Sequence, residues 1–253
     1  MQDDAHIFCS ESQLSEEIKS LIKMTFSVYK HFGFEDISIA LSTRPEKRVG
    51  NEKLWDKSEK ILKEVLSQTV ESFTVQEGEG AFYGPKIEFS LTDSLDRIWQ
   101  CGTIQLDFSM PSALTASYVD ENDNKLVPVM IHRAILGSIE RFIGILLEHY
   151  GGNLPFWLSP KQIIIANISD KHVKFAENIK NLLQLNGFRC SLDLRNEKIG
   201  YKIRELIIAK VPYVVIIGDK EVSSGNISVR EYDGTEHDSI SVDDFIKKLS
   251  SKK

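Results

Sequence analysis

The chain has 253 residues, of which 42% are hydrophobic and 27% are charged, a balance that excludes an intrinsically disordered chain. Its length allows one large domain or two ordinary ones. No segment approaches the ~20 apolar residues of a membrane span, and two aspartates stand near the start, where a secretory signal would carry basic residues. Three well-separated cysteines favour free thiols in a reducing compartment. We therefore expect a cytoplasmic globular protein without a membrane partner.

Charge is distributed unevenly along the chain. The net charge is −6, but residues 160–253 carry +3 and the preceding residues carry −9. An acidic segment joined to a basic one can indicate a nucleic-acid contact on one side. Three excess charges over such a length also fall within ordinary variation, so charge alone does not assign a nucleic-acid partner.

Up to residue 150, the hydrophobic pattern predicts strands interrupted by helices. The strands alternate apolar and polar residues, whereas the helices repeat apolar residues every three or four positions. Several long strands with few crossover helices favour an antiparallel sheet. The predicted strands are 3–9, 36–42, 86–91, 97–109 and 125–135, and the predicted helices are 12–33, 51–68 and 138–150.

After Pro160 the pattern changes to strand–helix–strand–helix–strand, which predicts two crossovers and a parallel core. A further strand is expected near residues 226–234. Ser241 followed by Asp244 resembles a capping box and predicts a last helix. The earlier elements are strands 162–168, 188–194 and 211–218 and helices 169–187 and 197–210.

The first predicted strand places Gln2, Asp4 and His6 on one face, with apolar side chains opposite. Three such side chains in a row suit a polar pocket or part of a metal site. A solvent-facing strand explains the same pattern, and for three isolated residues it is the simpler interpretation.

The segment GEGAFYGPKIEF combines three glycines with Tyr83 and Lys86. Glycine lets the backbone approach a ligand closely, tyrosine offers an amphipathic wall, and lysine offers a point charge for phosphate. An ordinary Gly-Pro turn explains the segment equally well. On the strand that follows, Thr103 and Gln105 share a face, and Gln100 joins them only if there is a β-bulge at Gly102.

The segment IHRAILGSIERFIG places His132 at a strand end and an arginine in the following helix. Gly137, Arg141 and Gly144 have the spacing of one helix face, where a planar group could stack on the guanidinium. Close helix packing beside an exposed arginine is the alternative.

In the second domain, Asn196 and Glu221 each follow a predicted parallel strand. Open α/β sheets bind ligands at the carboxyl ends of their strands. Polar side chains that read base edges, beside basic residues that hold phosphate, would suit single-stranded RNA. A solvated helix face is an equally good explanation. The nearby basic residues are Arg195, Lys198, Lys202 and Arg204.

Seven segments together closely resemble threonyl-tRNA synthetase, a class II aminoacyl-tRNA synthetase. They span nearly the whole chain in family order, and IHRAILGSIERF is specific to this enzyme. The resemblance implies an α+β protein in which residues 1–153 are the C-terminal part of a class II catalytic domain, with an antiparallel sheet incomplete at its N-terminus. Residues 154–253 would form a mixed-sheet α/β anticodon-binding domain. The segments are QDDAHIFC, LSTRPEKRVG, GEGAFYGPKIEF, WQCGTIQLDF, VPVMIHRAILGSIERFIGIL, LDLRNEKIGYKIRE and GDKEVSSG.

The resemblance implies a threonine pocket with an active-site zinc ion, of which His6 and His132 are two protein ligands. Zinc that binds the threonine amino and hydroxyl groups rejects valine, because a site built to bind a hydroxyl loses affinity when it is missing. Asp4 would accept a hydrogen bond from the threonine hydroxyl. The other residues implied to line the pocket are Gln2, Tyr83 and Gln105.

The resemblance also implies sites for ATP, which binds with Mg²⁺, and for tRNA(Thr). Gln100 and Thr103 match ribose contacts, Lys86 lies beside the nucleotide, and Arg141 matches the motif 3 arginine that stacks on adenine. Lys86 and Arg141 are thus the implied catalytic residues. Lysine stands at position 210, where arginine is common in the family. The implied anticodon-reading residues are Asn196, Lys210, Glu221 and Arg230.

The chain departs from the family pattern, because it starts inside class II motif 2. The cysteine that is the third zinc ligand, the motif 2 arginine and the motif 1 helix of the family homodimer lie outside this sequence. None of the three cysteines present matches the zinc position. Two histidines make a weak zinc site compared with three protein ligands and an open position.

We therefore expect the C-terminal part of a threonine–tRNA ligase, which forms threonyl adenylate from threonine and ATP and transfers threonine to tRNA(Thr). Alone, the chain should form adenylate poorly. One alternative is a non-catalytic tRNA-binding module with a scaffold-only catalytic remnant. Another is a paralogue that acts on a different amino acid, which the retained Asp4, His6 and His132 disfavour.

Overall fold

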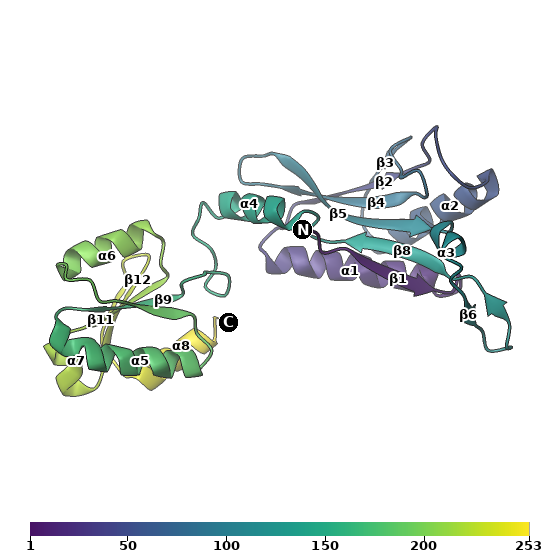
Figure 1. The fold of residues 1–253 in the computed structure, drawn as a ribbon. Coiled ribbons are helices and arrows are strands. Elements are labelled where there is room, and N and C mark those ends of the chain that lie inside the picture. Colours follow the sequence, from purple (N-terminus) through teal and green to yellow (C-terminus); the bar gives the residue numbers. More distant parts are fainter. Residues whose placement is uncertain (253) are drawn as a thin grey trace. The chain divides into compact units, whose positions relative to one another are not determined.

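The structure is a computed structural model that describes residues 1–252, and the chain divides into two compact units, Met1–Tyr150 and Gly151–Lys253 (Figure 1). Each unit is described by itself. The first unit ends at Tyr150, three residues before the domain end expected from the sequence at residue 153. Among the described residues, no helix is both long enough and apolar enough to cross a membrane.

A six-stranded sheet forms the first unit, and all neighbouring strands are antiparallel except the parallel pair β2–β3. This confirms the expected antiparallel sheet. The sequence analysis missed β3 because its three side chains are all exposed and show no alternation. The strands in sheet order are β1 (Ala5–Cys9), β8 (Val129–Ala134), β5 (Ile98–Asp107), β4 (Lys86–Thr92), β2 (Ile37–Ser42) and β3 (Thr74–Gln76).

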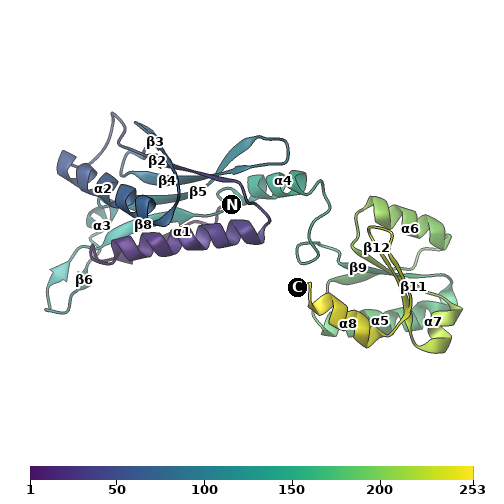
Figure 2. The same ribbon diagram turned by 180° about the vertical axis from the view of Figure 1, so that it is seen from behind.

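Two long helices, α1 (Leu14–His31) and α2 (Glu52–Thr69), pack against each other on one face of this sheet (Figure 2). Their buried apolar side chains drive this packing, since each buried Leu or Ile contributes about 1.5–3 kcal/mol. The opposite face is therefore left for polar side chains. The buried apolar residues of the two helices are Leu14, Ile18, Leu21, Ile22, Tyr29, Trp55, Leu62, Val65 and Leu66.

The helix after β8, α4 (Ile139–His149), is shorter than its sequence pattern suggested. Gly137 lies before it with φ +67°, so Gly137 does not share a helix face with Arg141 and Gly144. Ile143 is 49% exposed, whereas Ile145 is buried. The unit also contains two short elements without an amphipathic signal, α3 (Met110–Ala113) and β6 (Tyr118–Val119). The single strand predicted over residues 125–135 is wrong: β7 (Lys125–Leu126) pairs with β6, and β8 begins only after Pro128, which has no backbone N–H to donate.

The second unit is a five-stranded mixed sheet, as expected: β10, β9 and β11 are parallel, and β12 and β13 continue antiparallel. The sequence analysis did not predict β13, whose segment EHDSI is largely polar, or the short helix α7. In sheet order the strands are β10 (Cys190–Asp193), β9 (Ile163–Asn167), β11 (Tyr213–Ile217), β12 (Ile227–Glu231) and β13 (Glu236–Ile240), and the helices are η1 (Asp170–His172), α5 (Val173–Leu185), α6 (Ile199–Ile208), α7 (Asp219–Ser224) and α8 (Val242–Ser250).

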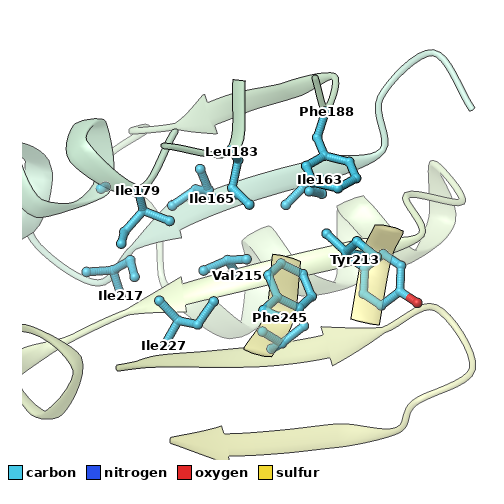
Figure 3. Packing of buried hydrophobic residues seen from close by; sticks show 13 residues of the cluster. Ile163, Ile165, Ile179, Leu183, Phe188, Tyr213, Val215, Ile217, Ile227 and Phe245 are labelled. Carbon is cyan, nitrogen blue, oxygen red and sulfur yellow. The ribbon is translucent and has the colours of Figure 1, made fainter. Parts of the chain in front are cut away.

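One face of this sheet carries the core of the second unit. Strand residues Ile165 and Val215 pack against Leu183 of α5 and Phe245 of α8 (Figure 3). The predicted cap of α8 is confirmed, because the Ser241 hydroxyl accepts a hydrogen bond from the backbone N–H of the third helical residue. Helix α6 covers the other face (Figure 1).

Near this core, Glu231 makes the second unit sensitive to acid. Burial raises the pKa of this carboxyl, but hydrogen bonds from Lys248 and His237 outweigh burial and lower the pKa to about 2. A lowered pKa stabilises the folded state above about pH 4.5, and this contribution disappears as the pH falls toward 2. Glu231→Gln should therefore cost about 2 kcal/mol at pH 7 and much less at pH 2–3 in urea unfolding. The control, Glu177→Gln on the exposed side of α5, should leave stability at pH 7 unchanged. Equal losses at both pH values for Glu231→Gln would contradict this account.

Candidate functional site

Two histidines lie side by side on neighbouring strands of the first unit's sheet. His6 in β1 and His132 in β8 are direct register partners, and their ring centroids are 4.7 Å apart with the rings edge to face. His6 Nε2 lies 3.9 Å from Asp4 Oδ2. The alternation of the strands therefore brings together the two imidazoles and the carboxylate that the sequence analysis singled out.

Asp107, at the end of β5, holds His132 in place. Its side chain is fully buried, and one carboxylate oxygen lies 3.1 Å from His132 Nε2. The other oxygen accepts the backbone N–H groups of Ser109 and Met110, each at 2.8 Å. A carboxylate bound to one ring nitrogen fixes the ring orientation and leaves the other nitrogen for a ligand. The sequence analysis missed Asp107, although its spacing of two from Gln105 could have revealed it.

Tyr83 completes this side of the cluster. Its ring centroid is 5.1 Å from that of His132, and its hydroxyl donates to Gln105, whose amide nitrogen lies 3.1 Å from the Thr103 hydroxyl. Burial, followed by the charges of Asp107 and Asp4, raises the pKa of the Tyr83 phenol, so it remains a hydrogen-bond donor. The result is a polar pocket wall of fixed donors and acceptors.

The glycines on either side of Tyr83 are needed for close backbone approach. A Cβ on Gly84 would lie 1.7 Å from the carbonyl oxygen of Leu106, and one on Gly80 would lie 2.5 Å from that of Thr43. The segment is therefore more than an ordinary turn, because it is pressed against the end of β5 and against the segment after β2.

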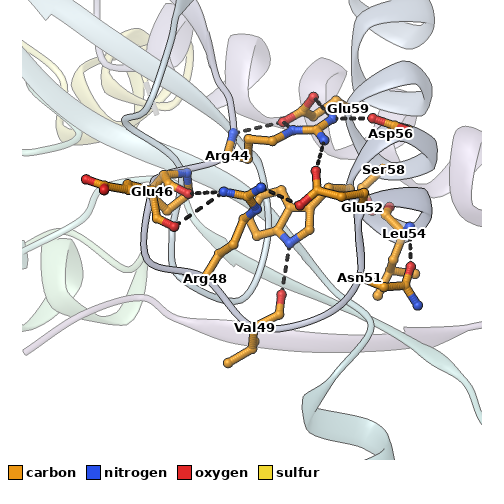
Figure 4. A network of polar contacts seen from close by, with 12 residues as sticks. Arg44, Glu46, Arg48, Val49, Asn51, Glu52, Leu54, Asp56, Ser58 and Glu59 are labelled. Atoms are coloured by element: carbon orange, nitrogen blue, oxygen red, sulfur yellow. Dashed lines mark hydrogen bonds and ion pairs between the residues drawn. The ribbon is translucent and has the colours of Figure 1, made fainter.

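The segment after β2 is in turn anchored to α2 by Arg44 (Figure 4). The Arg44 guanidinium donates to Glu59 and Asp56 at 2.6 Å each and to Glu52 at 2.9 Å. Backbone hydrogen bonds then join this segment to the Gly-rich loop: Gly80 donates to Thr43 at 2.7 Å, and Val49 donates to Phe82 at 2.8 Å. This chain of contacts determines where Tyr83 lies.

A β-bulge in β5, next to Gly102, brings Gln100 to the face of Thr103 and Gln105, so the condition stated for Gln100 is met. Phe89 pairs with Gly102 and Ser90 pairs with Gln100, so Cys101 is the extra residue. Arg141 of α4 donates to the Gln100 carbonyl oxygen.

On neighbouring β4, Lys86 forms an ion pair with the buried Glu88. Gln2 lies before the start of β1 and forms an isolated β-bridge with Ser138.

Zinc requires three protein ligands and an open position at such a site. Within residues 1–252, no group of three His, Cys, Asp or Glu side chains could hold a metal ion. The described residues thus contribute two imidazoles and do not complete a zinc centre.

In the second unit, Asn196 follows β10, and Glu221 lies in α7 after β11. The parallel order of these strands places both residues at the carboxyl edge of the sheet. The Glu221 carboxylate accepts from the Gly218 N–H at 2.8 Å and from the Ser228 hydroxyl at 2.6 Å. This edge is where open α/β sheets bind ligands.

Arg230 and Lys210 lie next to α6 but outside it. Arg230, in β12, lines a groove of about 450 Å³ together with the exposed apolar side of α6, and it pairs with Glu236 at 2.7 Å. Lys210 follows the C-terminus of α6 and donates to the Gly151 carbonyl oxygen at 2.5 Å. Of the four residues, Asn196 precedes α6, Lys210 follows it and Arg230 lines its groove, whereas Glu221 lies in α7.

Two of the nearby basic residues are not free to hold phosphate, contrary to the sequence analysis. Lys202 is 1% exposed, and its ammonium donates to three protein oxygens. The Arg195 guanidinium is bound by Asp193 and Glu205. Local charge density indicated a basic surface, but burial and pairing remove these two residues from it.

Comparison with known proteins identifies the class. Residues 1–150 match the model of the tRNA synthetase class II core domain (G, H, P, S and T), and residues 162–252 match that of the anticodon binding domain. The chain belongs to this class II tRNA synthetase family.

Among individual proteins, the chain is similar to threonine–tRNA ligases. It is 54% identical over 251 residues to that of Halorhodospira halophila and 57% identical over 246 residues to that of Prochlorococcus marinus. The two matches include 99% and 97% of this chain, respectively, but only 39% of the length of either relative. It also matches a crystal structure titled as the RNA binding domain of threonyl-tRNA synthetase from Cryptosporidium parvum, with 41% identity and a TM-score of 0.93, covering 99% of this chain and 63% of that one.

Proposed function

We propose that this chain forms the amino-acid pocket and the anticodon-binding part of a threonine–tRNA ligase. The observation that carries the proposal is the convergence of His6, His132 and Asp4 beside Tyr83 and Gln105 in a chain more than half identical to threonine–tRNA ligases. We further propose that the longer protein acts in the cytoplasm as a homodimer, by analogy with the family.

In the proposed reaction, the threonine carboxylate attacks the α-phosphate of Mg²⁺-bound ATP and pyrophosphate leaves. The terminal ribose hydroxyl of tRNA(Thr) then attacks the carbonyl, and AMP leaves. Positioning and electrostatic stabilisation carry such steps. Gln100 and Thr103 would bind the ribose, Arg141 would stack on adenine, and Lys86 would lie beside the phosphates, held there by Glu88.

We propose that Asp4, Gln2, Tyr83 and Gln105 bind threonine itself. Asp4 would accept the hydrogen bond of the threonine hydroxyl. His6 and His132 would supply two ligands of a zinc ion that recognises the same hydroxyl and the amino group, with the remaining ligand from a part of the longer protein outside this sequence. Asn196, Lys210, Glu221 and Arg230 would contact the anticodon.

The test joins this chain to the upstream part of the Halorhodospira halophila relative, and we call the product the joined protein. It should catalyse threonine-dependent ATP–pyrophosphate exchange and charge tRNA(Thr), whereas the chain alone should bind the anticodon hairpin without exchange. The intact relative is the control. A folded joined protein that binds the hairpin but charges no tRNA would favour a non-catalytic RNA-binding module instead.

A further inference from the structure

Lys202 is the only buried side chain of α6. Its ammonium donates to the backbone and side-chain oxygens of Asn167 and to the backbone oxygen of Asp193, each at 3.0 Å. All three donors of the ammonium are therefore satisfied. The acceptors belong to the carboxyl ends of β9 and β10, so one lysine ties α6 to two neighbouring strand ends.

The rest of α6 buries little apolar surface for a helix that packs on a sheet. Ile203, Leu206 and Ile207 are only partly buried, and Ile208 is 70% exposed. An amphipathic helix is usually held by an apolar face that the core covers. Here the apolar contribution is small, and the buried ammonium supplies a fixed, directional attachment. Burial lowers the pKa of Lys202, as expected for a charge removed from water.

The loop that carries Asn196 is fastened at the same place. Asp193, whose backbone oxygen binds Lys202, binds the Arg195 guanidinium with both carboxylate oxygens at 2.7–2.9 Å. Arg195 also donates to Glu205 of α6 at 2.6 Å. Residues 194–198 are thus held between the end of β10 and the helix.

We propose that Lys202 is a positioning residue for RNA recognition, which fixes α6 and the 194–198 loop so that Asn196 and the α6 groove present one preformed surface to the anticodon. This inference rests on the proposed function. Lys202 does not touch RNA, because its donors are all used inside the protein. Lys202 would increase the selectivity of RNA binding by fixing the shape of the binding surface. Its positive charge would not attract the RNA directly.

The test measures binding of a fluorescent anticodon hairpin of tRNA(Thr), and of a hairpin with altered anticodon bases, to the whole chain. Lys202→Met keeps most of the side-chain length without the ammonium, so it leaves the oxygens of Asn167 and Asp193 without this donor. It should reduce the preference for the cognate hairpin at least about fivefold and speed amide exchange in α6. Lys174→Met removes the same charge from the exposed side of α5 and should leave both unchanged.

Retained preference and unchanged exchange in Lys202→Met would overturn the positioning role while leaving the proposed function intact. No preference in the unaltered chain would overturn both. If Lys202→Met fails to fold, Asn167→Ala removes one of the three acceptors and should reduce the preference about twofold to threefold. An unchanged preference in Asn167→Ala would then count against the inference.

Discussion

The Gly84→Ala variant is expected to lose about 3 kcal/mol or more of unfolding free energy, the range of severe overpacking. A Cβ at this position would lie 1.7 Å from the carbonyl oxygen of Leu106 and 2.8 Å from its carbonyl carbon. These are backbone atoms of the central strand β5, and the Leu106 N–H also donates to Pro85 at 3.1 Å. The loop and the strand must therefore separate, which moves Tyr83 out of the pocket. Urea unfolding of the whole chain measures the loss.

Gly144→Ala is the matched control for this substitution. Gly144 lies in α4 with helical φ, and a Cβ there would meet nothing within 4 Å. Alanine in a helix is favoured over glycine by about 0.5–1 kcal/mol, so this variant should be slightly more stable. Equal stability of the two variants would show that the loop is not pressed against β5 as described.

His132→Ala in the joined protein is expected to lower kcat/KM for threonine at least about 100-fold. The change removes a ring that Asp107 orients and that faces His6 at a centroid distance of 4.7 Å. Loss of an oriented ligand or pocket donor typically has an effect of this size or larger. Pyrophosphate exchange at varied threonine concentration measures it, and bound zinc measured by mass spectrometry should fall in parallel.

His31→Ala provides the control, because it removes an imidazole from the exposed end of α1. Its kcat/KM for threonine and its zinc content should match those of the unaltered protein. If His132→Ala keeps both values while remaining folded, the paired histidines are not the amino-acid site.

Much of the fold could be predicted from the sequence because its elements are strongly periodic. The long helices α1 and α2 and the alternating strands β4 and β5 have unambiguous apolar faces, and the cap at Ser241 is a local signal. The elements that were missed are short or polar. β3 forms by pairing with β2, more than thirty residues earlier in the chain, and β13 is a largely polar strand that pairs with the neighbouring β12. Such pairing has no signal in local periodicity.

The candidate site was only partly predictable for a related reason. Alternation placed His6, Thr103 and Gln105 on the correct faces, but it left open whether a bulge at Gly102 brings Gln100 to the same face. Contacts between strands were not visible, so Asp107 was missed as the partner of His132. Lys202 was taken for a surface charge because composition does not show that three carbonyl and amide oxygens would surround its ammonium.

The most direct test of the central claim compares threonine with valine in pyrophosphate exchange by the joined protein. The two amino acids have nearly the same shape, and only threonine carries the hydroxyl that the pocket of Asp4, His6 and His132 would bind. We predict exchange with threonine that is at least about 100-fold more efficient than with valine. Equal exchange with both amino acids would contradict the assignment of this pocket to threonine.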